Sequence, residues 1–573
     1  MLVATRKKFN LNENTYQNIM KLGNIIKAAV VIAALVATLP SAAQPMSARQ
    51  ALLTLKTFKS GGKAVGTSFG YLIDRNGTVV SAWTPFNGAD SAVVVDAKGR
   101  SYPVEKIYGA SELYDIAKFA IGGATAVQPI SLAKTLPTGS VRMWIMTQKP
   151  ALVTPERSEK FMSKYNYYVL GGADALKENT ADYPNGAPAV NERGELVGIY
   201  NNGGTVLSVT DWRYTDELKP SGFAANDPTL SRTTIRKALP ADVKDARLAL
   251  MMAAQGRTAD YMATARDFMT MFPKETDGYY DLATLYWQQG KTAEADKLLR
   301  DAVDKATDKA DAHYNYSRSV WQKLSLMPEP PFADWTYDKA MAEADAAYKV
   351  KALPVYDEMR GKIEYSKGNY EKAYEKFMSL TKSMRNPDLF YEAAQCRQAL
   401  KASDAEILEL LDSAVGVCDT PYTTIAAPYF YARGTQLGKM GRYRDAMVDL
   451  YRYEALTTAL PPASFYYDRE QIEMKGKVYQ AALNDIMRAV VLDQRNAQLW
   501  AEKANVHLRV GQYADAMASA DVAIQLDSTY SVPYLIKGLA QCQSGKKDEG
   551  LANLQKAKDL GDTQADAFIK KFK

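Results

Sequence analysis

The spacing of hydrophobic residues divides the chain into two parts with different periods. From about residue 61 to residue 212 the chain has short alternating runs, rich in β-branched and aromatic residues, with turn residues between them. One pair of runs, Thr67–Ile73 and Thr78–Trp83, is joined by a turn that contains Asn76 and Gly77. Asn-Gly between two such runs indicates a hairpin, because a left-handed backbone costs little there. This part is therefore predicted to be an all-β domain over residues 44–217.

A helical period runs through the second part, from residue 242 to residue 573. Before it, residues 218–241 are rich in Pro, Ser, Thr and Asn, which predicts a linker. Glycines in the helical part recur at a spacing of 34 or 35 residues, at 256 and 290 and then at 441, 476, 511 and 545. A fixed period of this length indicates a repeat protein in which each unit is one pair of helices.

Each repeat unit places large and small apolar residues at fixed offsets. In one unit Tyr279, Ala283 and Tyr286 precede Gly290, and Ala295 follows it. Small residues allow the two helices of a unit to approach closely, and the glycine ends the first helix. The pattern therefore predicts two tightly packed helices per unit.

The same offsets recur around Gly441 and Gly511, and they resemble the tetratricopeptide repeat. The resemblance implies an all-α superhelix of about nine helix pairs over residues 242–573, with an inserted loop at 325–336 that contains three prolines. Repeat arrays of this kind curl around a concave groove, so the expected partner is a peptide or protein segment bound in that groove.

The first residues of the chain have the pattern of a secretory signal peptide. Two lysines precede an apolar stretch from Ala28 to Leu39, and small residues follow up to Ala43. A transmembrane helix needs about 20 apolar residues, so we expect cleavage near Ala43–Gln44 and no stable membrane span afterwards. Polar residues ahead of Met20 are unusual in a leader, and we expect translation to start at Met20. Residues 1–43 are then leader and signal peptide, and the mature protein is periplasmic or secreted.

Removing the leader changes the charge balance. The full sequence has 71 Lys+Arg against 65 Asp+Glu, and residues 1–43 hold five of the basic residues and one of the acidic residues. The remaining 66 basic and 64 acidic residues nearly cancel. Nucleic-acid binding needs a basic surface that neutralises phosphates, so no nucleic-acid partner is expected.

Four short motifs follow one another in the all-β part. They are GTSFG at 66–70, VVSAWTP at 79–85, YDIA at 114–117 and YPNGAP at 183–188. In this order they resemble the successive sequence motifs of trypsin-like serine endopeptidases of the Deg/HtrA type. The resemblance implies a trypsin-like double β-barrel, in which a His, an Asp and a Ser would form the catalytic set.

The chain departs from that family at the residues that would do the chemistry. Thr84 stands at the position of the catalytic His and Asn185 at that of the nucleophilic Ser, whereas Asp115 matches the Asp. A hydroxyl needs an adjacent base to attack at neutral pH, and an amide side chain is no nucleophile. Tyr183 and Pro184 alter the loop that forms the oxyanion hole, and proline has no N–H to donate. We therefore expect a pseudoprotease, with no catalytic residues.

Other chemistry has little support in the sequence. The two histidines, His313 and His507, lie in the helical part, where we expect packing residues with satisfied hydrogen bonds. No His, Cys and carboxylate set has metal-ligand spacing and no phosphate loop is present, so neither a metal nor a cofactor is expected. Cys396 and Cys418 could pair in an exported protein, but buried or free thiols fit the sequence equally well.

These features favour an exported, non-catalytic protein-interaction or scaffold protein. The repeats would bind a peptide or protein segment, and the degenerate barrel would be a second binding module. An alternative is a trypsin-like endopeptidase with an unorthodox or partner-completed active site. Ser68, Ser81 and Thr84 supply nearby hydroxyls for it, although none has an evident base. A third hypothesis is a structural role in an envelope complex.

Overall fold

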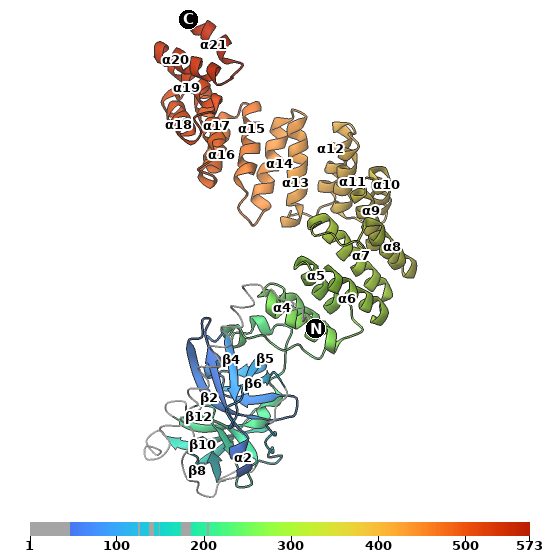
Figure 1. Ribbon diagram of the computed structural model, residues 1–573, viewed down its shortest axis with the longest axis vertical. Helices are drawn as coiled ribbons and strands as arrows, with labels where there is room; N and C mark the ends of the chain where they lie inside the picture. The colour runs from blue at the N-terminus through green and yellow to red at the C-terminus, as the bar shows by residue number, and fades with distance from the viewer. Residues whose placement is uncertain (1–45, 124–126, 137–141, 148, 173–184, 203–205) are drawn as a thin grey trace, which may run out of the picture. The chain divides into compact units, whose positions relative to one another are not determined.

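The computed structural model describes residues 46–573, apart from 124–126, 137–141, 148, 173–184 and 203–205. The chain divides into two compact units, the first ending at Ala312 and the second running His313–Lys573. After the short helix α2 (Met46–Gln50), strands come first and longer helices follow, which confirms the predicted order of an all-β region and an all-α repeat region (Figure 1). The leader, Tyr183 and Pro184 lie outside the described residues.

Six antiparallel strands close into a barrel in the first unit. Their order around the barrel is β1-β2-β3-β6-β5-β4. The strands are β1 (Leu52–Phe58), β2 (Ala64–Leu72), β3 (Thr78–Ser81), β4 (Ser91–Val95), β5 (Ser101–Ser111) and β6 (Ile116–Ile121). Along β1 every second residue is buried, as expected for a strand with one face on a core. The turn from β2 to β3 is the hairpin that Asn76-Gly77 predicts, with Gly77 at φ +87°.

A second antiparallel sheet of seven strands follows, in the order β8-β7-β11-β12-β13-β10-β9. The strands are β7 (Met143–Ile145), β8 (Ala151–Val153), β9 (Arg157–Phe161), β10 (Tyr165–Gly172), β11 (Pro188–Val190), β12 (Leu196–Asn202) and β13 (Val206–Asp211). In the part of the chain that the structure describes, β8 and β9 pair on one side only. Over the described residues this sheet is therefore a half-barrel that follows the closed barrel.

Residues 218–241, whose composition predicts a linker, form an ordered segment packed along the barrel, which we call the strap. Three of its apolar side chains are buried in the barrel core, namely Ala224, Leu230 and Ile235. The Ile107 N–H of β5 donates to Arg236 O at 2.9 Å, and Ala238 N–H donates to Ile107 O at 2.8 Å. Composition misses this packing because the few apolar residues of the strap are separated by polar turn residues.

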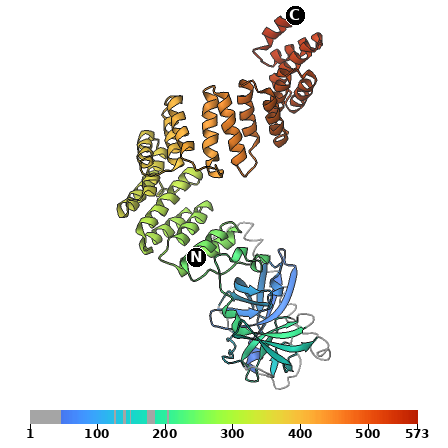
Figure 2. The ribbon, with the colours of Figure 1, turned by 180° about the vertical axis from the view of Figure 1, so that it is seen from behind.

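Helices occupy the chain from Val243 onward and alternate as hairpins (Figures 1 and 2). The first unit contains α3 (Val243–Ala253), α4 (Thr258–Met271), α5 (Asp277–Gln288) and α6 (Thr292–Lys305). Helix α7 (Lys309–Leu326) spans the boundary between the units, and the prolines of the predicted inserted loop lie between it and α8 (Tyr337–Val350).

The remaining helices of the second unit pair in chain order and end with a single helix. They are α9 (Pro354–Ser366), α10 (Tyr370–Thr381), α11 (Pro387–Ala399), α12 (Asp404–Gly416), α13 (Ala427–Lys439), α14 (Tyr443–Leu456), α15 (Ala463–Lys475), α16 (Tyr479–Leu492), α17 (Ala497–Arg509), α18 (Tyr513–Leu526), α19 (Ser531–Gln543), α20 (Lys547–Asp559) and α21 (Ala565–Phe572).

A residue with a left-handed backbone marks the turn inside most helix pairs. It is a glycine at Gly290, Gly368, Gly441, Gly511 and Gly545. In two other pairs it is a lysine, Lys401 at φ +56° and Lys477 at φ +59°. Gly476, which belongs to the glycine series of the sequence, has φ −74° instead. The repeat therefore follows this backbone position, and glycine marks it only in some pairs.

A small residue stands seven positions before the left-handed residue. It is Ala283, Gly361, Ala394, Gly434, Ala504 or Gly538. Space there is limited, since a Cβ on Gly434 would lie 2.9 Å from Leu450 Cγ. In the pair that turns at Lys477, this position holds Glu470, which is fully buried.

Candidate functional site

The barrel brings two of the three protease-like positions into direct contact. Thr84 opens a short 3-10 turn, η1 (Thr84–Phe86), after β3, and Asp115 directly precedes β6. The Thr84 backbone N–H and hydroxyl both donate to Asp115 Oδ1, at 2.6 and 2.8 Å. Because β3 and β6 are paired neighbours, the two residues lie at the same end of the barrel.

Asp115 is buried and has an uncommon backbone conformation. Its φ is +42°, in the left-handed region, and the residue is 5% exposed. Its other carboxylate oxygen, Oδ2, is buried without a hydrogen-bond partner among the described residues. A left-handed backbone is costly for a residue with a side chain, so the surrounding structure must hold it in place. The two hydrogen bonds from Thr84 are part of that support.

Asn185 does not join this pair. Its side-chain Oδ1 accepts from the Asn202 N–H at 2.6 Å, and its backbone O accepts from the Ser68 hydroxyl at 2.7 Å. Gly186 follows at φ +88°, and a Cβ there would lie 2.7 Å from the Ala82 nitrogen. Asn185 therefore belongs to a tight turn fixed on β2 and β12, and its amide is used as a structural acceptor.

The hydroxyls near this site all donate to oxygen atoms. Ser68 and Ser81 donate to backbone carbonyls, at 2.7 and 2.6 Å, and Thr84 donates to Asp115. The two histidines of the chain lie in helices α7 and α17. The described residues of the barrel region therefore contain no hydroxyl paired with an imidazole base.

Each histidine is hydrogen-bonded within the helical part. His313 Nδ1 lies 2.6 Å from Glu343 Oε2, and His507 Nδ1 lies 2.7 Å from Gln512 Oε1. Both partners belong to the same pair of helices as the histidine or to the turn inside it. These contacts fit structural roles.

The three cysteines are free thiols in this structure. Cys396 is buried, and burial raises its pKa to about 12. Cys418 Sγ donates to Ala414 O at 3.3 Å, and burial raises its pKa as well. Thiols react as thiolates, so these two cysteines are poor nucleophiles at neutral pH.

The described ranges contain neither a metal-ligand cluster nor a membrane-spanning helix. No group of three or more His, Cys, Asp or Glu side chains there is arranged to hold a metal ion. None of the helices in those ranges combines the length and the apolar character that a membrane crossing requires.

The first helices of successive pairs contact one another directly in the second unit. The contacts are Lys362 Nζ of α9 to Glu392 Oε1 of α11 at 3.2 Å, Tyr429 OH of α13 to Asp388 Oδ1 of α11 at 2.7 Å, Tyr431 of α13 to Phe465 of α15 at 6.2 Å between ring centroids, and Gln498 Nε2 of α17 to Tyr467 OH of α15 at 2.9 Å. We call the surface of α9, α11, α13, α15 and α17 the first-helix face.

Two tyrosines of the first-helix face, Tyr431 and Tyr467, lie near carboxylates. Tyr431 is partly exposed, and its pKa is raised by burial and then by the nearby charge of Asp468. Burial likewise raises the pKa of Tyr467, with Glu502 adding to the effect. Tyrosine offers a large rigid ring with a polar end, which suits it to recognising another protein.

A buried ionic network lies within the α14–α16 helices. The fully buried Arg469 pairs with Asp485, at 2.5 Å between Nε and Oδ2, and its guanidinium lies 4.3 Å from the Tyr451 ring centroid. Tyr451 OH donates to Glu473 at 2.6 Å. Burial raises the pKa of Glu473 to about 7 and that of Glu470 to about 9. At neutral pH Glu470 is therefore largely uncharged, whereas Glu473 is close to the midpoint of its titration.

The chain matches no protein-family model. Two curated proteins are similar to a part of it. A stretch of 100 residues is 30% identical to the small glutamine-rich tetratricopeptide repeat-containing protein 2 of Saccharomyces cerevisiae, and 94 residues are 31% identical to the TPR repeat-containing thioredoxin TDX of Arabidopsis thaliana. The matches cover 17% and 16% of this chain, and only 29% and 25% of the two relatives.

Solved repeat structures also align with the chain. YrrB, described as a TPR protein with an unusual peptide-binding site, has 15% identity and a TM-score of 0.30, with 34% of this chain and 96% of YrrB covered. The first TPR of Spaghetti (RPAP3), bound to an HSP90 peptide, has 20% identity and a TM-score of 0.19, with 19% and 89% covered. The names of the curated relatives and the paired helices support tetratricopeptide-type repeats in this chain.

Proposed function

We propose that this chain is an exported, non-catalytic protein-binding or scaffold protein. Its first-helix face docks a peptide or protein segment, and its barrel region is a second binding module, in an envelope complex or as a soluble receptor. One observation carries the non-catalytic assignment: the Thr84 hydroxyl, at the position of a protease base, donates to the Asp115 carboxylate. Similarity to two proteins named for tetratricopeptide repeats supports the binding role.

The barrel region is proposed to be a degenerate trypsin-like domain of the Deg/HtrA type. In support of this, a closed six-stranded barrel precedes a second antiparallel sheet, and the motif residues Thr84 and Asp115 meet at one end of the barrel. Without a base at position 84 or a nucleophile at Asn185, such a domain holds a peptide but does not cleave it. The endopeptidase alternative needs a base that the described residues do not supply.

Export rests on the signal-peptide pattern that ends near Ala43, and residues 1–45 lie outside the described part of the chain. Mass spectrometry of the protein recovered from the native organism tests it. We expect a mature amino terminus at Gln44 in the envelope or secreted fraction. A cytoplasmic protein that keeps residues 20–43 would contradict export.

A photo-crosslinking amino acid at two exposed positions tests the docking surface. Tyr431, 37% exposed, reports on the first-helix face, and Met487 of α16, 46% exposed, is the matched control on a second helix. We expect a discrete crosslinked partner in the native envelope from position 431 and none from position 487. Equal crosslinking from both positions, or none from either, would count against this face.

Hydrolysis is tested separately on the full mature chain. We expect no cleavage of a denatured protein substrate and no labelling by a serine-directed fluorophosphonate. Cleavage that disappears in Asp115→Ala would overturn the non-catalytic assignment and favour the endopeptidase alternative.

A further inference from the structure

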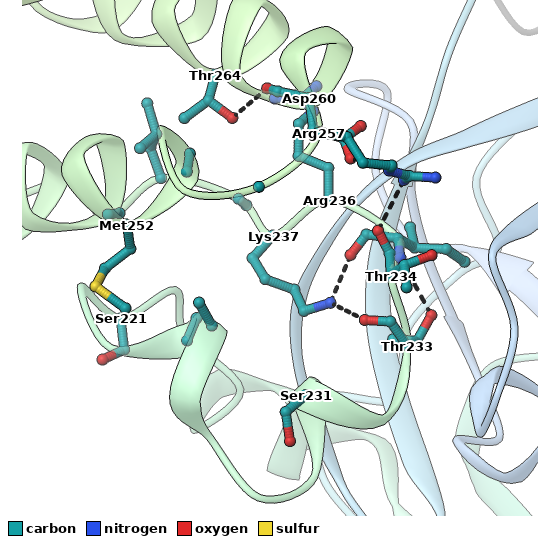
Figure 3. A pocket seen from close by; sticks show the side chains of 18 of the residues that line it. Ser221, Ser231, Thr233, Thr234, Arg236, Lys237, Met252, Arg257, Asp260 and Thr264 are labelled. Carbon is teal, nitrogen blue, oxygen red and sulfur yellow. Dashed lines mark hydrogen bonds and ion pairs between the residues drawn. The ribbon is translucent and has the colours of Figure 1, made fainter. Parts of the chain in front are cut away.

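A cavity of about 210 Å³ lies between the strap and helices α3 and α4 (Figure 3). Strap residues from Ser221 to Leu239 form one wall, and residues from Ala249 to Thr264 form the other. All of them belong to the first unit. An apolar cavity of about 150 Å³ in another protein accommodates benzene, so this space is large enough for a small organic molecule.

Lys237 lines this cavity, and its ammonium group donates two of its three possible hydrogen bonds. Its Nζ donates to Thr233 O at 2.8 Å and to Ile235 O at 2.5 Å. Figure 3 shows both bonds running to the strap, away from Met252 on the opposite side of the cavity. An ammonium has three N–H donors, so one remains for a further acceptor.

The charged side chains of the cavity wall leave Lys237 without a counterion. The wall contains three cations, Arg236, Lys237 and Arg257, and the carboxylate of Asp260. Arg257 Nε already pairs with Asp260 at 2.6 Å, and Arg236 pairs with Asp267 at 2.6 Å. No described carboxylate pairs with Lys237, and burial lowers its pKa to about 8. The cavity therefore has an excess of positive charge, located at Lys237.

Most of the remaining wall is hydrocarbon. Leu239, Ala249, Met252 and Ala253 line it. A molecule that satisfies both the ammonium and this surface needs one anionic end and an apolar body. A carboxylate matches a single ammonium better than a phosphate does, because a phosphate is held by several donors.

We propose that this cavity binds a small aliphatic monocarboxylate. Its carboxylate accepts the third N–H of Lys237, and its carbon chain lies against Met252 and Ala253. The ligand sits where the strap meets the first helix pair. This site is independent of the protein-binding role of the helical repeats.

Calorimetric titration of the full mature chain tests the site at pH 7. The probes are butanoate, hexanoate and octanoate, with hexan-1-ol as the neutral match of hexanoate. We expect at least one of the acids to bind, and hexanoate to bind at least tenfold more tightly than hexan-1-ol. Lys237→Met keeps a side chain of similar length without the charge and should weaken acid binding at least tenfold, whereas Lys237→Arg should retain most of it.

A second variant keeps the test valid if Lys237→Met fails to fold. Ala253→Leu leaves the cation in place and fills the space, so it should abolish acid binding while circular dichroism stays native. At pH 8 binding of the acid should also be accompanied by uptake of up to about half a proton by Lys237, because about half of Lys237 is neutral in the free protein near its pKa. The charges of Asp260 and Asp227 raise the pKa of Lys237, and the charge of Arg257 lowers it. Asp260 and Arg257 pair with each other.

Three results would overturn the proposal. They are no binding of any of the three acids, equal binding of hexanoate and hexan-1-ol, and unchanged acid affinity in a folded Lys237→Met or Ala253→Leu variant.

Discussion

The Thr84 hydroxyl donates a hydrogen bond of 2.8 Å to the Asp115 carboxylate, and the Thr84 N–H donates to the same oxygen at 2.6 Å. In a serine protease the carboxylate orients an imidazole. Here it fixes the turn that follows β3. Thr84 and Asp115 are therefore part of the support of this end of the barrel.

Thr84→Val should destabilise the first unit by about 1 kcal/mol, because the Asp115 carboxylate loses one hydrogen bond while the side chain keeps its shape. Thr84→Ser keeps the hydroxyl and is the matched control, with little expected loss. Urea unfolding followed by tryptophan fluorescence measures both. Equal stability of the two variants would show that the contact contributes nothing.

Lys477→Gly should stabilise the second unit by about 1 kcal/mol, because glycine adopts a left-handed backbone without the steric cost of a side chain. Lys477 is exposed at φ +59°, so little packing is lost with its side chain. Lys401→Gly should act in the same direction. Thermal unfolding by circular dichroism measures the change.

Gly441→Lys is the reverse control at an equivalent turn. Gly441 has φ +77°, and we expect a loss of about 1 kcal/mol. A melting temperature that rises in this variant would contradict the assigned equivalence of the two turns.

The stability of the second unit should fall as the pH rises from about 4.5 to 7. Burial raises the folded pKa of Glu473 to about 7, above its unfolded value, so the unfolded chain loses this proton first. That difference corresponds to about 3 kcal/mol at most for this one group. The contribution of Glu473 to stability is therefore fully present below about pH 4.5 and has been lost when the pH reaches its folded pKa of about 7.

Glu473→Gln should flatten this pH dependence, although not completely, because burial also raises the pKa of Glu470 and Glu392. Urea unfolding at pH 5 and pH 8 gives the comparison. If the wild-type chain and Glu473→Gln lose the same stability between these two values, Glu473 is not the titrating group.

Asp267→Asn should cost about 2 kcal/mol in the first unit. Asp267 Oδ2 accepts from both Lys106 of the barrel and Arg236 of the strap at 2.6 Å, and its loss leaves two partly buried cations without a partner. The exposed pair of Arg247 and Glu275 provides the control, since Glu275→Gln should change stability by less than about 1 kcal/mol.

Because of Asp267, the first unit should also lose stability in acid. Burial alone would raise the pKa of Asp267, but hydrogen bonds from Lys106 and Arg236 hold it below its ordinary value. Its contribution is present above about pH 4 and is lost as the pH falls through the lowered folded pKa. Asp267→Asn should therefore reduce the dependence of stability on pH below about pH 4. An acid unfolding curve that is the same in this variant as in the wild-type chain would rule out a contribution from Asp267.

Local features of the structure were accessible from the sequence. Asn76-Gly77 specifies its hairpin because the left-handed requirement is met by adjacent residues. The helix pairs follow from apolar residues a few positions apart. The glycine spacing predicts the turn at Gly476, but the neighbouring Lys477 has the left-handed backbone. A lysine in that conformation cannot be recognised from the sequence.

Contacts between distant segments were less accessible. The order of motifs suggests the pairing of Thr84 with Asp115, whereas the hydrogen bond from the Thr84 hydroxyl to the carboxylate is evident only from the structure. The hydrogen bond from the Ser68 hydroxyl is accepted by the backbone carbonyl of Asn185. Every residue has such a carbonyl, so the sequence does not indicate which one accepts. The cavity beside Lys237 depends on two segments that meet only after folding.

The strap also sets an order of events during synthesis. Ribosomes release a chain from its amino terminus, and β6 ends at Ile121, whereas Leu230 and Ile235 of the barrel core emerge more than 100 residues later. The six strands can pair early, but they enclose an incomplete interior until the strap arrives. A fragment that stops at residue 217 would hold all the described strands of the first unit and still have an apolar gap in its barrel, open to aggregation.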